Sequence, residues 1–185
     1  GQYTTPVGVP EIVREGTDVT VVSYGSTFNL CETASVQLND VGISCELIDV
    51  QTLLPFDINH VIVESLKKTN KIIFIDEDVP GGATAFMMQK VLTEQKGYYF
   101  LDAEPKTLSA KDHRPAYGTD GDYFSKPNLD DIFEAIYEIM HDYNPSSFPS
   151  IHWTMKYFFS LITVCIVVGI TAQTKLTEEL INYME

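Results

Sequence analysis

The sequence has few basic residues. Its 185 residues include 12 lysines and arginines against 26 aspartates and glutamates, which gives a formal net charge of −14. A protein that binds nucleic acid needs a basic face to displace counterions from the phosphates, so this balance argues against a nucleic-acid partner. Two interpretations remain: the charge keeps an acidic domain apart from its neighbours in solution, or it attracts a basic partner.

Cysteine is also scarce, and the spacing of the three cysteines is not that of a zinc site. Cys31 falls in a helical apolar pattern and Cys45 in an extended one, whereas Cys165 lies far downstream. We expect Cys31 and Cys45 to be reduced core residues of a cytoplasmic domain. The motifs HExxH, GxSxG and CxxC are absent from the sequence, so it carries no signature of a self-contained hydrolase or metalloenzyme.

What the sequence does contain is an alternation of strand-like and helical segments. Apolar, β-branched runs predict strands over residues 18–25, 44–54, 71–78 and 105–113. Helical periodicity follows each of these strands, with N-caps expected at Ser26, Asp57 and Asn128 and a further helix from Gly82 to about Gln95. Residues 128–143 form the clearest amphipathic helix. This order predicts a three-layer α/β/α fold with a mostly parallel sheet of about five strands.

Composition divides the chain into four parts. We expect a leading linker, the α/β domain, a proline- and serine-rich linker and an apolar tail, over residues 1–17, 18–143, 144–154 and 155–185 respectively. The sequence begins without an initiator methionine, so we also expect a piece of a longer protein.

The apolar tail has several interpretations. From Tyr157 to Thr174 there are 18 uncharged residues, which is barely enough to span a bilayer. The same stretch, with Met155 before it and small residues near Ala172, is typical of a secretory signal peptide. We expect residues from about 150 onward to be foreign to the domain. A genuine membrane anchor and a buried apolar helix are the alternatives, and only an anchor would place the chain at a membrane.

The stretch KIIFIDEDVPGGATA, residues 71–85, is the most informative motif. A strand that runs into a glycine-rich turn and a helix is a common phosphate site, but this turn lacks the glycine spacing and the lysine of the known fingerprints. Its three consecutive acids would repel a phosphate more strongly than a helix N-terminus attracts it. Two interpretations remain: the acids and glycines shape the turn, or they form a surface for a basic partner.

The order of the motifs resembles the C-terminal domain of transketolase-like thiamine enzymes, and most of all the β part of the E1 component of 2-oxoacid dehydrogenase complexes, fused α/β forms included. The resemblance rests on VPEIVREGTDVTVVSYGS, GISCELIDVQTLLPFD, SLKKTNKIIFIDEDVPGGATA and HRPAYGTDGDYFSKPNLDDIFEAI, which stand in the family's order and together span nearly all of residues 6–140. It implies a domain that pairs subunits and docks the subunit-binding domain of the E2 core. Oxidative decarboxylation of the 2-oxo acid, with acyl transfer to lipoyl-E2, belongs to the whole enzyme.

In that family, thiamine diphosphate and magnesium are held by the other two domains. The resemblance therefore implies that this chain alone binds neither and is inactive without the remaining E1 domains or an α subunit. TDGD at 119–122 echoes the start of the magnesium motif, but no Asn-Asn pair follows, so we interpret it as a turn. The residues that we expect near a subunit contact, with a second copy or with E2, are Asp76, Glu77, Asp78, Gly81, Gly82, His113 and Arg114.

Three further expectations complete the prediction. General acid–base work by His113 is disfavoured, because its neighbour Asp112 would point to the opposite side of an extended segment. Met87 and Met88 are expected to fill gaps in the core, and the aromatic residues of 98–100 to be buried under a neighbouring element. Two other functions remain open: the same domain in a transketolase or deoxyxylulose-phosphate synthase, or a non-catalytic binding module.

Overall fold

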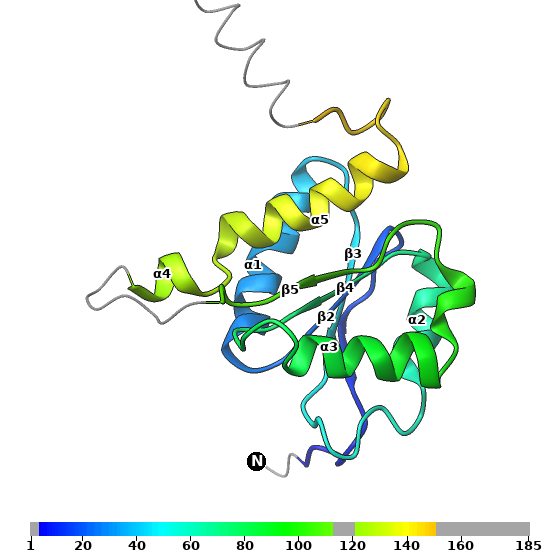
Figure 1. The fold of residues 1–185 in the computed structure, drawn as a ribbon. Helices are drawn as coiled ribbons and strands as arrows, with labels where there is room; N and C mark the ends of the chain where they lie inside the picture. The colour runs from blue at the N-terminus through cyan, green and yellow to red at the C-terminus, as the bar shows by residue number, and fades with distance from the viewer. Residues whose placement is uncertain (1–3, 113–120, 151–185) are drawn as a thin grey trace, which may run out of the picture. The chain divides into compact units, whose positions relative to one another are not determined.

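A computed structural model describes residues 4–112 and 121–150, and Figure 1 shows a mixed sheet with helices on both faces. The sheet has five strands in the order β1-β3-β2-β4-β5. Strands β2, β3, β4 and β5 run parallel, and β1 pairs antiparallel with β3 at one edge. In chain order the strands are β1 (Glu11–Arg14), β2 (Val19–Ser23), β3 (Cys45–Asp49), β4 (Ile72–Ile75) and β5 (Lys106–Leu108).

The helices connect these strands and form the outer layers. In chain order they are α1 (Gly25–Asp40), α2 (Val61–Thr69), α3 (Ala83–Met88), the π-helix η1 (Gln89–Glu94), the 3₁₀ helix η2 (Gly97–Phe100), α4 (Gly121–Ser125) and α5 (Leu129–Tyr143). Helices α1 and α5 lie side by side on one face of the sheet, whereas α2 and α3 lie on the other (Figure 1). The predicted three-layer α/β/α fold is confirmed.

The central strands are apolar on both faces because helices cover both. Every residue of β2 and β4 is buried. Alternate positions face opposite layers, so Val22 and Phe74 join the core beneath α2, α3 and η1. The residues that precede these two in their strands, Val21 and Ile73, point to the opposite face of the sheet and are also fully buried. The four-residue strand β1 is exposed along its whole length, as its edge position dictates.

The helix starts were predicted only in part. Asn128 caps α5 as expected: its side chain accepts hydrogen bonds from the amides of Asp130 and Asp131, in a complete capping box. Ser26 lies inside α1, whose N-cap is Tyr24 without a side-chain bond, so that prediction was wrong. Asp57 lies three residues before the N-cap of α2, yet its carboxylate still accepts hydrogen bonds from the first amides of that helix.

Two parts of the chain form separate compact units, residues 1–144 and 145–185. The segment 1–17, expected as a linker, contains strand β1. Cys31 and Cys45 are buried free thiols, as predicted, and burial raises the pKa of each to about 12. Within residues 4–112 and 121–150, no helix combines the length and the apolar character needed to cross a bilayer. The predicted tail, 155–185, lies outside the described residues.

Candidate functional site

The order of the strands selects one edge of the sheet as the candidate site. From β2 the chain crosses to β3 on one side, and from β3 it crosses back to β4 on the other side of β2. In open α/β sheets, ligands bind at the carboxyl ends of two neighbouring strands whose outgoing connections run to opposite sides. Here that place lies between the end of β2, where Tyr24 stands, and the end of β4, where the acidic turn of residues 76–82 begins. We call it the carboxyl-edge site.

Asp76 is the first residue of the acidic turn and lies inside the protein. Its side chain is only 2% exposed, and one carboxylate oxygen accepts a 2.8 Å hydrogen bond from the hydroxyl of Tyr24. The other oxygen accepts a 2.7 Å bond from the amide of Glu77. Burial, reinforced by the hydrogen bond with Asp76, raises the pKa of the Tyr24 hydroxyl far above its ordinary value. Asp76 thus joins β4 to β2 and is not exposed to a protein partner.

Asp78 shapes the turn itself. One of its carboxylate oxygens accepts a 2.8 Å hydrogen bond from the amide of Val79. A Cβ atom on Gly82 would overlap the other oxygen, so the carboxylate can fold back only because residue 82 is glycine. Gly81 has φ +86°, a backbone conformation that side chains rarely adopt. Two of the expected interface residues, Asp78 and Gly82, therefore serve the conformation of the turn.

Glu77, like Asp78, lies on the exposed side of this turn. Its side chain is 46% exposed and forms a 3.1 Å ion pair with Lys126, just before α5. A hollow of about 330 Å³ lies here, between Glu77, the first turn of α1 and residues 126–129. Val79 and Pro80, next along the turn, are exposed too. The outward surface of the turn is therefore an apolar tip beside the exposed acids Glu77 and Asp78.

The carboxyl-edge site is badly suited to a phosphate group. The helix that follows the turn, α3, has six residues, and the carboxylate of Asp78 occupies the space before its first turn. Asp76 and Glu77 add two more carboxylates. Among residues 4–112 and 121–150, no three histidine, cysteine or acidic side chains gather as they would around a metal ion. His113 and Arg114, the remaining interface candidates, lie outside the described residues.

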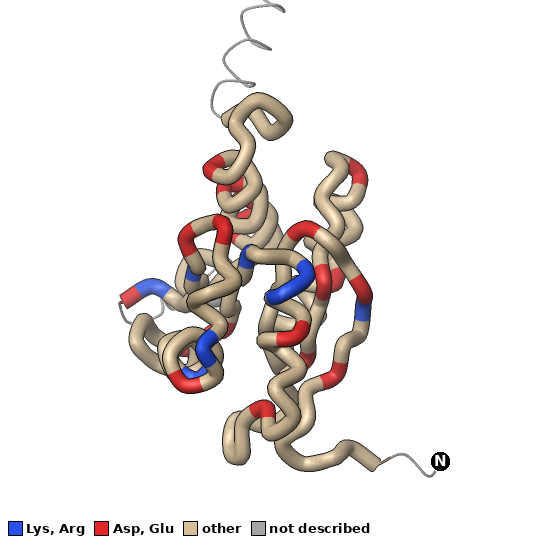
Figure 2. Tube along the Cα trace, turned by 90° about the vertical axis from the view of Figure 1, so that its right-hand side faces the viewer, with Lys and Arg blue, Asp and Glu red and all other residues tan. Residues whose placement is uncertain are grey.

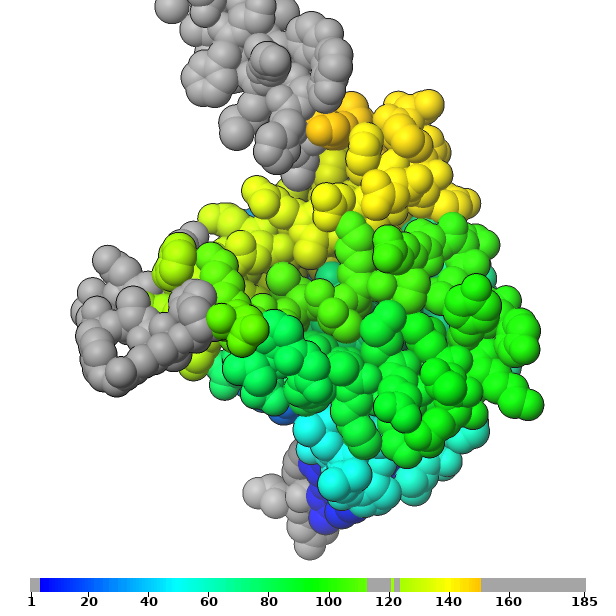
Figure 3. All heavy atoms as spheres, in the orientation of Figure 1, coloured from blue at the N-terminus to red at the C-terminus, as the bar shows by residue number. Residues whose placement is uncertain are grey.

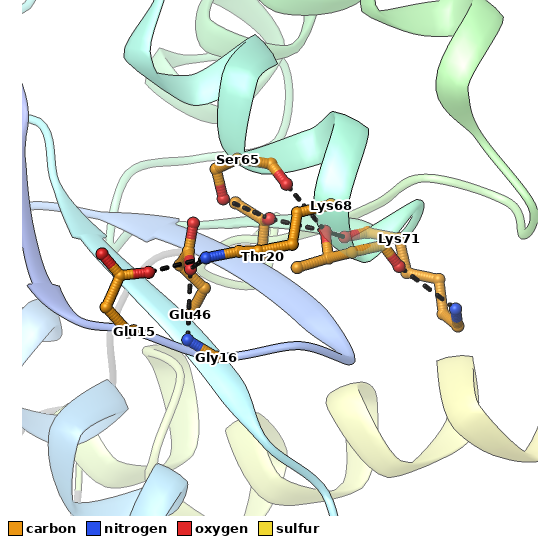
Figure 4. A network of polar contacts seen from close by, with 8 residues as sticks. Glu15, Gly16, Thr20, Glu46, Ser65, Lys68 and Lys71 are labelled. Atoms are coloured by element: carbon orange, nitrogen blue, oxygen red, sulfur yellow. Dashed lines mark hydrogen bonds and ion pairs between the residues drawn. The ribbon is translucent and has the colours of Figure 1, made fainter.

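Sequence reasoning missed a buried ion network at the opposite, amino edge of the sheet (Figure 4). Glu46 of β3 is completely buried, and one of its oxygens accepts a 3.1 Å bond from the amide of Gly16 and pairs with Lys68 of α2. Lys68 also pairs with Glu15 at 2.6 Å. The hydrogen bond from Lys68 holds the pKa of Glu15 below its ordinary value, and the bond with Glu15 raises the pKa of Lys68.

Next to this ion network, three buried hydroxyl groups join β2 to α2. The Thr20 hydroxyl lies 2.7 Å from that of Ser65 and 2.7 Å from that of Thr69 (Figure 4). Glu46, a charged residue inside strand 45–49 and flanked by apolar residues, is the one signal in the sequence, because a buried carboxylate needs a partner. Nothing in the sequence identifies the partner as Lys68. This network connects α2 and the segment before β2 to the sheet. We assign it a role in stability.

Charge on the surface is predominantly negative. Figure 2 shows acidic positions on most elements and only isolated basic ones. Of the described lysines, most already face a carboxylate within the domain, as Lys67, Lys106 and Lys126 do.

The fold and the site together define a doubly wound α/β domain with an antiparallel edge strand and an acidic, glycine-rich turn where related folds hold a ligand. The chain belongs to the transketolase C-terminal domain family, whose model matches residues 8–127. The predicted family is confirmed.

Similar proteins include dehydrogenase subunits. The beta subunit of acetoin:2,6-dichlorophenolindophenol oxidoreductase from Bacillus subtilis (strain 168) is 39% identical over 113 residues, 61% of this chain and 32% of that protein. The beta subunit of the pyruvate dehydrogenase E1 component from Rhizobium meliloti (strain 1021) is 30% identical over 134 residues, 72% of this chain and 29% of that protein. The chain thus spans about a third of the length of these curated relatives.

A solved structure also shares the fold. It is described as a split gene transketolase, an inactive β4 tetramer, and it matches with a TM-score of 0.64 at 21% identity, over 77% of this chain and 45% of that one. At this identity the likeness shows the fold alone.

Proposed function

We propose that this chain is the C-terminal assembly domain of a thiamine diphosphate-dependent 2-oxoacid dehydrogenase E1. The observation that carries the proposal is that the family match covers residues 8–127, while the matched parts of two similar beta subunits make up only 32% and 29% of those proteins. The whole enzyme would decarboxylate a 2-oxo acid oxidatively and pass the acyl group to lipoyl-E2. This domain would supply subunit pairing and E2 docking.

The surface proposed for these contacts is the outward side of the turn 77–82. It combines the exposed carboxylate of Glu77 with the exposed side chain of Val79, 53% of whose surface is open to solvent. An apolar centre beside a charged rim is the usual anatomy of a protein interface. Asp76 and Asp78 hold the turn in shape, so they support the contact without making it. The partners would be the other E1 domains or an α subunit, a second copy, and a basic E2 subunit-binding domain.

The described residues of this chain do not fit thiamine diphosphate. The three carboxylates of the turn, two of them engaged in hydrogen bonds within it, occupy the place where a diphosphate would approach the sheet. Like charges at such short range repel strongly. The coenzyme and its magnesium ion would be held by the other domains of the enzyme, and no step of the reaction is assigned to the side chains described here.

A second candidate comes from the family itself, which takes its name from transketolase. In a transketolase or a related carbon-transfer enzyme, the same domain would pair subunits without a lipoyl-E2 partner. Binding of an E2 subunit-binding domain separates the two functions.

Calorimetric titration with an isolated E2 subunit-binding domain tests the proposal. The wild-type chain should bind it, and Glu77→Lys should weaken binding by about tenfold, because the substitution replaces an exposed attractive charge with a repulsive one. Glu104→Lys is the matched control: it reverses one exposed glutamate before β5, at the amino edge of the sheet. Absence of binding by the wild type, or equal weakening by both variants, would contradict the proposal.

A further inference from the structure

A second hollow lies on the outer surface of α3 and η1, away from the turn 77–82. It has a volume of about 750 Å³. One wall is a helical stripe that starts at Ala85 and ends at Thr93, and includes Met88 and Leu92. The opposite wall is made by Tyr98, Tyr99 and Pro105. Figure 3 views the molecule from the side on which α3 and the residues after it lie, drawn in green.

The local sequence explains how the two walls come together. Lys96 ends the helix with φ 61°, which turns the chain back sharply. A Cβ atom on Gly97 would lie 2.9 Å from the carbonyl oxygen of Val91, so only glycine lets η2 approach η1 so closely. This close approach places the tyrosine pair beside the stripe that contains Leu92.

The tyrosines were expected to be buried, and the structure shows the opposite. Tyr98 is 70% exposed and Tyr99 is 79% exposed. Their ring centroids are 6.2 Å apart at an interplanar angle of 72°, which is an edge-to-face arrangement. Met87 is fully buried as expected, and Met88 is partly buried against the core and also lines the hollow. Aromatic and methionine side chains grouped on a surface mark a binding site.

Lys96 gives this site a charge preference. Each of the other described lysines contacts a carboxylate or lies over an aromatic ring, as Lys90 does with Glu94 and Lys111 with Phe124. Lys96, which lines the hollow, has neither kind of partner among residues 4–112 and 121–150. In a chain of net charge −14, an ammonium group without a carboxylate partner beside an apolar hollow is an unusual feature.

We propose that the hollow binds a small amphipathic carboxylate. Its apolar body would lie between Leu92 and the tyrosine rings, and its carboxylate would face the ammonium group of Lys96. The volume falls within the range of small-molecule sites, which are mostly apolar with a few polar groups. The site goes beyond the proposed function, because it lies on a different surface and needs neither E2 nor a second copy.

The affinity follows from the exposure of the site. Ligands of about a dozen non-hydrogen atoms gain roughly 0.3 kcal/mol per atom, so the dissociation constant should be about millimolar. An ion pair with an exposed lysine is weak, so the carboxylate should bind about two- to fivefold more tightly than an uncharged ligand of the same shape.

The probe is 4-phenylbutyrate, titrated into the full chain labelled with ¹³C at the methionine methyl groups. The Met88 signal, assigned with Met88→Leu, should shift and saturate at about millimolar concentration. The buried Met87 should shift less and serve as the internal reference. 4-Phenylbutyramide should bind about two- to fivefold more weakly. Lys96→Met should abolish this difference, and Lys111→Met should preserve it.

Three outcomes would overturn the inference. A Met88 signal that never shifts would show that the hollow binds no such ligand. Equal affinities for 4-phenylbutyrate and 4-phenylbutyramide would contradict a role of the ligand's charge in binding. Loss of the difference in both lysine variants would show that net charge, and not Lys96, attracts the ligand. None of these outcomes bears on E2 docking, so the two proposals can fail separately.

Discussion

Tyr24 and Asp76 join the carboxyl ends of two neighbouring strands that are 52 residues apart in the sequence. The Tyr24 hydroxyl donates to the Asp76 carboxylate at 2.8 Å, and the carboxylate is almost completely buried. Asp76, which the sequence suggested as part of a docking surface, therefore connects β2 to β4.

Removing the Tyr24 hydroxyl should destabilise the domain. Tyr24→Phe leaves one oxygen of a buried carboxylate without its donor, and we expect the free energy of unfolding to fall by about 1–3 kcal/mol. Urea denaturation measures this loss. Tyr98→Phe is the matched control, because Tyr98 is 70% exposed and should change stability by less than about 0.5 kcal/mol. Equal effects of the two substitutions would contradict the role of the Tyr24–Asp76 bond.

Adding a methyl group at Gly82 should disturb the turn through Asp78. Gly82→Ala forces the Asp78 carboxylate away from its bond with the Val79 amide, and this should cost about 1 kcal/mol of unfolding free energy. In an Asp78→Ala background the overlap is gone, so Gly82→Ala should cost clearly less. A double-mutant cycle by denaturant unfolding measures the coupling. An identical cost in both backgrounds would mean that the carboxylate and the glycine act independently.

These two contacts show where sequence reasoning succeeds and where it stops. Apolar periodicity predicted the central strands and the amphipathic α5, because burial on one or both faces leaves a direct trace in the pattern. The acidic turn was found as a motif, but the sequence did not predict which of its acids would be buried and which exposed. Whether Asp76, Glu77 or Asp78 points inward depends on Tyr24 and Gly82, and on a packing geometry that appears only when the strands are placed.

Breaking the Lys68–Glu46 pair should have a larger effect than breaking an ordinary surface pair. Lys68→Met removes the cation that pairs with the buried Glu46 carboxylate. We expect the free energy of unfolding to fall by about 2–3 kcal/mol. This loss is smaller than for a fully buried pair, because Lys68 is partly exposed. Glu46→Gln in the Lys68→Met background should restore part of it. Thermal and urea unfolding of the three variants tests this. If the double variant is no more stable than Lys68→Met, Glu46 is not the cause.

The same network should make stability depend on pH in the acid range. The folded-state pKa of Glu15 lies below its ordinary value of 4.5, chiefly because of the hydrogen bond with Lys68. The contribution of the Glu15 carboxylate to the free energy of unfolding is therefore present above about pH 4.5 and is lost as the pH falls through the folded-state pKa. The stability difference between the wild type and Glu15→Gln should stay constant above that pH and shrink below it.

Urea unfolding across the acid range measures this dependence, with Glu104→Gln as an exposed control. A wild-type advantage over Glu15→Gln that persists unchanged to the lowest pH would contradict the assignment. So would an acid-dependent difference of equal size for Glu104→Gln.

In the aromatic segment 98–100, the expected burial was wrong for Tyr98 and Tyr99, whereas Phe100 packs against the core. Two adjacent tyrosines after a helix are typical of a buried connection, and burial was expected on that ground. The structure exposes both rings because Lys96 and Gly97 turn the chain tightly onto η1. Gly97 is a signal for a tight turn that the sequence shows, whereas the left-handed conformation of Lys96 is visible only in the structure. The direction in which the rings then point depends on the space that the π-helix leaves.

The most direct test of the central claim follows the backbone amide resonances of residues 77–82 during two titrations of the full chain. One titrant is an E2 subunit-binding domain, and the other is thiamine diphosphate with magnesium. We predict that the protein domain shifts these resonances and that the coenzyme leaves them unchanged. Shifts of the turn with the coenzyme, and none with the E2 domain, would contradict its assignment as an assembly element.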